Sequence, residues 1–206
     1  MEYEAVTTAL GILGSYLCLL IAQSAGQQLS SGWRVSWSVS VAMIVVGGVT
    51  GYLMTSVSPP AATVAVIMAI LLVIQTPLDI AFRRLWRTPT LVATGLLQFP
   101  QIDNVRESGW WSGFLRVNLQ VLLIFFCFAA VHRLSRQSLG FGDVLIVVPA
   151  GLAVAISMSH MLVWWLFLAA VSGAVHGIIK RHQQLKHIPF APHILIPAWA
   201  ISVLNL

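Results

Sequence analysis

Long apolar runs, separated by short polar stretches, dominate this chain. Several runs approach 20 residues, the length that a helix needs to cross the hydrocarbon core of a bilayer. The runs that we expect to cross are residues 5–23, 37–56, 61–79, 89–101, 114–131, 142–158, 161–179 and 188–206. The pattern predicts an all-α, polytopic integral membrane bundle of about eight transmembrane helices, built as a single membrane-embedded domain over residues 1–206. The run 89–101 is the short one, and we interpret it as a tilted helix or a re-entrant segment.

Composition strengthens this interpretation, because only 8% of the 206 residues are charged while 58% are hydrophobic. Soluble domains carry roughly 25% charged residues, so this chain cannot cover a soluble surface. The net charge of +5 does not indicate a nucleic-acid partner, since the basic residues cluster in short loops between the apolar runs. The partner that this composition predicts is the lipid bilayer.

The distribution of the basic residues predicts the orientation of the helices. With the N-terminus outside and eight crossings, nine of the eleven Lys and Arg residues fall on one side of the membrane: Arg34, Arg83, Arg84, Arg87, Arg133, Arg136, Lys180, Arg181 and Lys186. Cytoplasmic loops are enriched in Lys and Arg, so that side is predicted to be cytoplasmic. The prediction puts Asp79 and Asp143 at the cytoplasmic ends of their helices, whereas Asp103 falls in an external loop.

A carboxylate at the mouth of a membrane helix is costly and needs a reason. Asp79 ends one apolar run and Asp143 begins another, directly after Gly140-Phe141-Gly142. Two carboxylates in one site can hydrolyse a peptide: the ionised group takes a proton from water, and the protonated group polarises the scissile carbonyl. Close carboxylates favour this shared-proton state because two adjacent negative charges repel. We therefore expect an intramembrane aspartyl protease site.

Four short motifs resemble those of the prepilin peptidases, the type IV leader peptidases. LGFGDV at 139–144 resembles their GxGD signature, and HIPFAP at 187–192 resembles their IPFGP-like stretch. Asp79, followed by basic residues and TPT at 88–90, resembles their D…IPN pattern, and GSYL at 14–17 resembles their opening GSFLN. The large family members also carry a methyltransferase insert with a cysteine pair between the first two helices. Here that loop is short and has no cysteine, so we predict no N-methylation.

The resemblance implies a membrane aspartyl endopeptidase that removes the short, basic leader of type IV pilin-like precursors at the cytoplasmic face of the bacterial inner membrane. It implies that Asp79 and Asp143 are the catalytic pair and that the protein substrate is bound by Gly140, Phe141, Gly142, Pro189, Phe190 and Pro192. Glycines without a Cβ would let a substrate backbone approach closely. No cofactor or metal is expected, because the cysteines and histidines show no ligand spacing.

Other interpretations of these residues stay open. Asp143 near a helix N-terminus is also a favourable helix cap, and Asp79 can pair with Arg83 or Arg84 one turn away. Paired acids inside a bundle also serve proton-coupled transporters. A catalytically inactive relative that acts in pilus or secretion assembly is a further alternative, motivated by Leu145, where the family often has Lys, and by the wider spacing from Asp79 to Pro89.

Overall fold

The computed structural model describes residues 2–54, 59–108, 111–134, 140–181 and 189–204. Within these ranges the chain is helical and contains no strand, so the predicted all-α class is confirmed for the described residues. In chain order the elements are α1 (Glu2–Leu29), α2 (Trp37–Leu53), α3 (Pro59–Phe82), α4 (Arg87–Leu96), α5 (Gln98–Ser108), α6 (Trp111–Leu134), α7 (Phe141–Met158), the 3-10 turn η2 (Ser159–Met161), α8 (Leu162–Arg181) and α9 (Ala191–Leu204).

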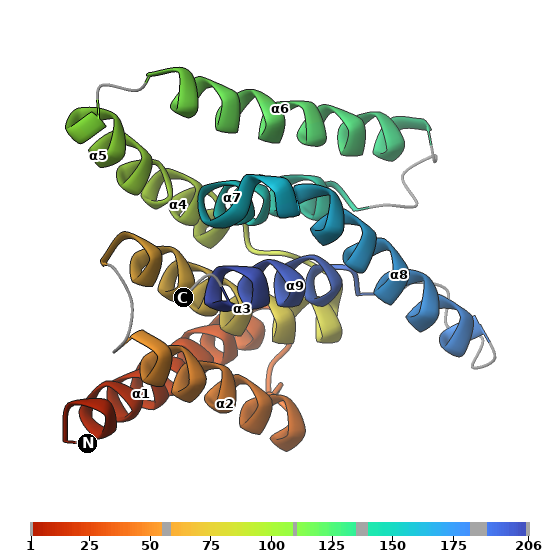
Figure 1. Cartoon of the computed structure of the whole chain (residues 1–206). Coiled ribbons are helices and arrows are strands. Elements are labelled where there is room, and N and C mark those ends of the chain that lie inside the picture. Colours follow the sequence, from red (N-terminus) through yellow and green to blue (C-terminus); the bar gives the residue numbers. More distant parts are fainter. Residues whose placement is uncertain (1, 55–58, 109–110, 135–139, 182–188, 205–206) are drawn as a thin grey trace.

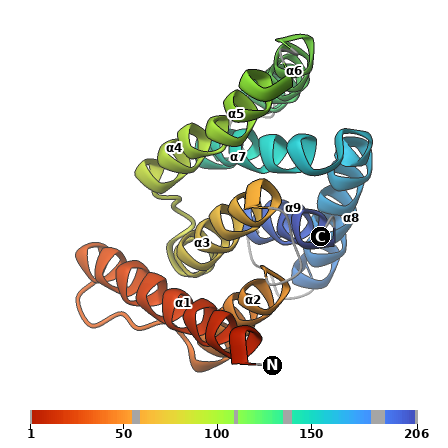
Figure 2. The ribbon, with the colours of Figure 1, turned by 60° about the vertical axis from the view of Figure 1, so that its left-hand side comes forward.

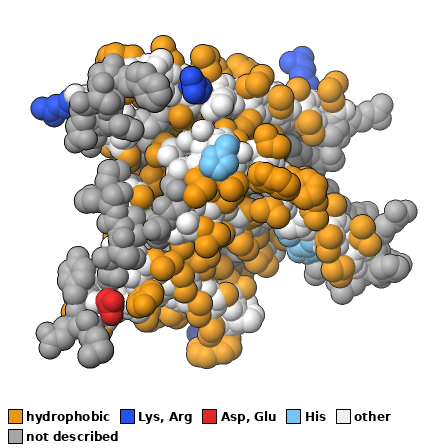
Figure 3. Space-filling view, in the orientation of Figure 1, with side chains coloured by type: hydrophobic (Ala, Val, Ile, Leu, Met, Phe, Trp, Pro, Cys, Tyr) orange, Lys and Arg blue, Asp and Glu red, His pale blue; other side chains and the backbone are white. Residues whose placement is uncertain are grey.

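In the part of the chain that the structure describes, four helical segments are long and apolar enough to cross a membrane: Glu4–Leu29, Ala61–Phe82, Trp111–Leu134, and Phe141–Ile179, which takes in α7 and most of α8. Two further apolar helices, α2 and α9, are shorter. Hydrophobic side chains cover much of the described part of the face seen in Figure 3. Such a surface suits lipid and not water, which agrees with a membrane protein.

The helices α3, α7 and α9 form the centre of the bundle, and each packs on the other two. In the Ala61–Phe82 segment 78% of the apolar window is buried, against 6% for Trp111–Leu134. In Figure 2, α3 lies between α1 and α2 on one side and α4 and α5 on the other, while α6 lies at the periphery. Both sequence-predicted aspartates are therefore on helices of the core.

Two predicted loops are partly helical. The polar loop expected from residue 24 begins later, because α1 continues to Leu29 and the chain turns at Gly32, which has a positive φ of 84°. Ala and Gln in this stretch are good helix formers. The loop expected over 101–113 instead holds most of α5, and the short run 89–101 is divided between α4 and α5, which are joined at Leu97 (Figure 1).

Side-chain amides join α5, the helix found in place of the predicted loop, to α6. Gln98 donates a hydrogen bond to Asn118 of α6 at 3.2 Å, and Asn118 donates to Gln101 at 3.2 Å. These hydrogen bonds between side-chain amides connect the polar helix α5 to the apolar helix α6. Hydrophobic periodicity alone does not reveal such pairing, because the contact is polar and joins residues that are far apart in the sequence.

The contact between α1 and α2 depends on glycine. A Cβ on Gly47 would overlap the carbonyl oxygen of Gly11 and the hydroxyl of Ser15, and Gly51 lies equally close to Thr7. Small residues at such positions let two membrane helices approach backbone to backbone. These glycines hold α1 and α2 together.

We expect Gly47→Ala to separate α1 from α2 and to destabilise the fold by about 2 kcal/mol or more, the cost of overpacking against backbone that cannot yield. The apparent melting temperature in detergent should fall. The matched control is Gly95→Ala in α4, where a Cβ would meet no atom of the described residues within 4 Å. That change should be neutral or stabilising by up to about 1 kcal/mol. Equal melting temperatures for both variants would contradict this account of the interface.

Candidate active site

Asp79 lies near the C-terminal end of α3 and is only 4% exposed. Its Oδ2 accepts a hydrogen bond from the backbone N–H of Ala191 at 2.8 Å, and the backbone of Phe190 lies close to the same carboxylate. Ala191 begins α9, so Asp79 binds unpaired amides at a helix N-terminus. A carboxylate is favoured there by both the free N–H groups and the helix dipole.

Asp143 lies in the first turn of α7, where Gly140 is the N-cap residue. Its Oδ2 accepts the N–H of Gly140 at 3.1 Å, and its own N–H donates to the Gly140 carbonyl at 3.1 Å. The helix-cap interpretation of Asp143 therefore has a direct geometric basis. The capping hydrogen bond leaves acceptor positions of Asp143 unused, because an ionised carboxylate has two oxygens and about four acceptor positions.

The structure brings the two aspartates together, although they come from distant parts of the sequence. The charge of Asp79 acts on Asp143, and the nearest basic residues are Arg83, which acts on Asp79, and His132, which acts on Asp143. Arg83 follows α3 directly and is a non-glycine residue at positive φ, 54°. Two carboxylates on different core helices thus share one end of the bundle, with a basic residue next to each.

Gly142 has a packing use that the sequence did not reveal. A Cβ at this position would lie 3.0 Å from the Cβ of Leu85, in the connection between α3 and α4. The absent side chain therefore lets α7 approach Leu85. The predicted room for a substrate backbone is taken up at Gly142 by this contact. At Gly140 a Cβ would meet, among the described residues, the carboxylate of Asp143 at 3.1 Å.

The remaining predicted binding residues flank the aspartates from two sides. Phe141 is exposed, and its ring lies 5.8 Å from that of His132. Pro189 and Phe190 precede α9, and Pro192 lies in its first turn. The side chain of Phe190 fits against Gly173 of α8, which makes it a packing residue even though its backbone contacts Asp79. Leu139, His187 and Ile188 of the motifs lie outside the described residues.

Sequence reasoning missed Gln75, a fully buried residue one turn before Asp79 on α3. Its amide nitrogen donates to the carbonyl of Trp86 and to the hydroxyl of Thr90, and its oxygen accepts the N–H of Trp86 at 2.9 Å. This clamp fixes the connection from α3 to α4, which carries Arg83 and Leu85. A polar residue inside an otherwise apolar run was the signal that could have identified it.

Replacing Gln75 by Leu should cost about 2 kcal/mol or more, since the N–H of Trp86 loses its partner and the carbonyl of Trp86 loses one of its donors, keeping the hydroxyl of Thr90. We also expect the connection holding Leu85 against Gly142 to loosen. Thermal unfolding in detergent measures the first effect. Gln27→Leu, the same change at an exposed position of α1, is the control and should stay within about 0.5 kcal/mol of the wild type. A stable Gln75→Leu variant would show that the clamp contributes little.

A pair of histidines joins α8 to α9. Nδ1 of His176 and Nε2 of His193 are 2.8 Å apart, and the ring of Phe190 lies 6.3 Å from that of His193. The pair orients the first turn of α9, where Ala191 binds Asp79. Among the described residues no three His, Cys, Asp or Glu side chains gather where they could hold a metal ion.

Comparison of the chain with protein-family models, curated proteins and solved structures gives no match. The functional argument therefore depends on the residues and their geometry.

Proposed function

We propose that this protein is an intramembrane aspartyl endopeptidase that removes the leader peptide of type IV pilin-like precursors. The observation that carries the proposal is the pair of carboxylates, Asp79 on α3 and Asp143 on α7, which lie within electrostatic range at one end of the core helices. The GxGD-like and IPFGP-like motifs meet at this pair, because Ala191 of the second motif binds Asp79.

In the proposed reaction, one carboxylate of the pair takes a proton from a water molecule, which attacks the scissile carbonyl. The other, protonated carboxylate donates a hydrogen bond to the carbonyl oxygen and stabilises the charge that develops there. The C–N bond then breaks, and the leaving amine takes the proton that the first carboxylate removed from water, which returns the pair to its singly protonated state. The pair shares one proton at the start of the cycle, since two adjacent charges repel. The amide of Ala191 holds Asp79 in place, and the amide of Gly140 holds Asp143.

The proposed topology has eight crossings, an external N-terminus and an active site facing the cytoplasm of a bacterial cell. Here α4 and α5 together form one interrupted crossing, and α7 and α8 form two. The support is the positive-inside rule, which assigns nine of the eleven basic residues to the cytoplasmic side. A transporter would usually bind its cargo near the midplane of the membrane, whereas both aspartates lie at helix ends.

The test is coexpression with a pilin-like precursor, followed by gel analysis of leader loss. We expect a shortened product only in cells that carry the protein. Intact precursor in those cells would overturn the proposal. Normal pilus assembly or secretion by a variant that lacks both carboxylates would instead favour the inactive assembly partner.

A further inference from the structure

Arg83 has an unusual backbone conformation for its residue type. It follows Phe82, the last residue of α3, and with a φ of 54° it is the one non-glycine residue at positive φ among those that the structure describes. Its N–H donates to the carbonyl of Asp79 at 2.9 Å and so closes the last turn of the helix. A left-handed residue at such a position is usually glycine, because a Cβ is crowded there. The strain needs a reason, and the backbone alone does not provide one.

The surroundings of Arg83 hold this conformation in place. Trp86, three residues later, is bound through both its N–H and its carbonyl by Gln75 of α3. Leu85 packs on α7, where a Cβ at Gly142 would lie 3.0 Å from its own Cβ. Because these contacts fix the connection from α3 to α4, Arg83 cannot relax by shifting it. Strained residues that are held in this way cluster at functional sites.

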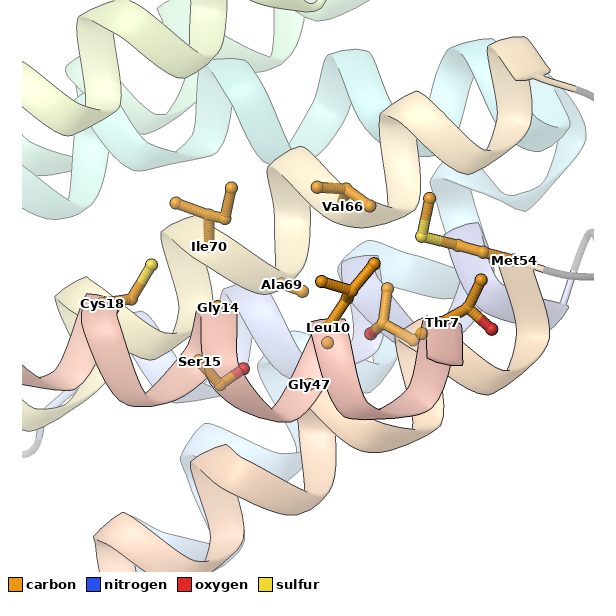
Figure 4. A pocket seen from close by; sticks show the side chains of 13 residues that line it. Thr7, Leu10, Gly14, Ser15, Cys18, Gly47, Met54, Val66, Ala69 and Ile70 are labelled. Carbon is orange, nitrogen blue, oxygen red and sulfur yellow. The ribbon is translucent and has the colours of Figure 1, made fainter. Parts of the chain in front are cut away.

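The aspartate pair needs a positive charge nearby. When Asp79 and Asp143 share one proton, the pair carries one negative charge, and a charge in apolar surroundings is costly unless it is compensated. Farther along α3 the interior offers no compensation. The cavity of about 270 Å³ that α3 lines with Val66, Ala69 and Ile70 has no charged residue among its described lining residues (Figure 4). The compensating groups are therefore expected at the end of the helix that holds Asp79.

Arg83 is the basic residue whose charge acts on Asp79. Its side chain is exposed, so the guanidinium stays hydrated while its charge adds to the hydrogen bond that Asp79 accepts from Ala191. Arg84, the next residue, is also exposed but lines a separate cavity together with Gln28 of α1. Of the two arginines that the sequence offers as partners of Asp79, the structure favours Arg83. A residue that served only to end α3 could be glycine and would carry no strain.

We propose that Arg83 is a positioning residue of the proposed reaction, held in a strained conformation so that its positive charge balances the single negative charge of the aspartate pair. The proposal rests on the proposed function, because it concerns the state in which the pair is ready to cleave. In this role Arg83 acts through Asp79 and makes no contact with the substrate.

Three variants at position 83 separate the charge from the backbone strain. Arg83→Lys keeps both, Arg83→Gln keeps only the strain, and Arg83→Gly removes both. We expect kcat for precursor cleavage to fall by about tenfold in the Gln and Gly variants, a modest effect because solvent screens an exposed guanidinium. The Lys variant should stay within about twofold of the wild type, since a point charge is enough for this role. KM should change by less than about twofold, because no interaction with the substrate is lost.

Melting temperatures in detergent supply the second measurement. Arg83→Gly should melt about 2–4 °C higher than Arg83→Gln, because glycine adopts a positive φ without strain, and yet it should cleave no faster. A glycine variant as active as the wild type would show that the residue only ends α3, and would overturn the proposal. Arg84→Gln is the matched control: it removes the same charge from the neighbouring position and should keep the wild-type kcat and KM.

Two other results would also overturn the proposal. A large rise in KM at unchanged kcat would show that Arg83 binds the substrate, and a Lys variant as slow as the Gln variant would show that charge is not what matters. If the wild type does not cleave, the proposed function falls, and melting temperatures at neutral pH still decide the role of Arg83. Arg83→Gln should then lower the melting temperature of the wild type but not of the Asp79→Asn variant, where the carboxylate next to Arg83 is gone. Equal shifts in both backgrounds would exclude charge balance.

Discussion

Asp143→Asn and Asp79→Asn are each expected to lower precursor cleavage by about 10³-fold or more. Losing either member of a general acid–base pair removes a contribution of roughly 10²–10⁴ in rate, and the two groups act as one unit. For the same reason the double variant should be scarcely less active than either single one. Leader removal is measured over time with purified protein and precursor in detergent or vesicles.

Asparagine is the appropriate replacement because it keeps the shape of the side chain and an acceptor oxygen. In the Asp79→Asn variant the amide oxygen can still accept the N–H of Ala191, so the fold should survive. Asp103→Asn in α5 is the control, since it changes the third aspartate of the chain and should keep wild-type activity. Full cleavage by either the Asp79→Asn or the Asp143→Asn variant, with a normal melting temperature, would rule out the proposed catalytic pair.

Much of the fold could be predicted because a bilayer imposes strong constraints on sequence. Apolar length predicted the long helices around 61–79 and 114–131, which α3 and α6 contain. The cost of an acid at membrane depth singled out Asp79 and Asp143, and the structure brings these two side chains into electrostatic range. The number of crossings and the orientation stay predictions, since they depend on the bilayer and not on the chain alone.

The unpredicted features are polar contacts between distant residues. The amides of Gln98 and Asn118 join α5, which the sequence predicted in part as a loop, to α6. Gln75 holds the connection between α3 and α4, which has no sequence motif of its own. The packing role of Gly142 could not be predicted, because it depends on Leu85, a residue distant in sequence that only the fold brings near. Hydrophobic periodicity shows which residues of a segment face an apolar environment. These contacts depend instead on which polar group of another helix lies opposite, and periodicity does not give that.

The largest stability effect should come from Trp165 of α8. Its side chain is fully buried in the core, and its Nε1 donates a hydrogen bond to the carbonyl of Ile194 in α9 at 2.9 Å. Trp165→Ala removes this bond and opens a cavity, which should cost about 3–5 kcal/mol. Because α9 presents Ala191 to Asp79, cleavage should fall together with the melting temperature.

Trp165→Phe separates the two contributions. It keeps most of the ring but loses the N–H, and a single hydrogen bond between membrane helices is worth only about 1 kcal/mol. We therefore expect a small drop in melting temperature for Phe and a large one for Ala, followed for both variants in the same detergent. If Phe were as damaging as Ala, the bond to Ile194 and not the volume of the ring would hold α9 against α8, and Asp79 would depend on that one polar contact.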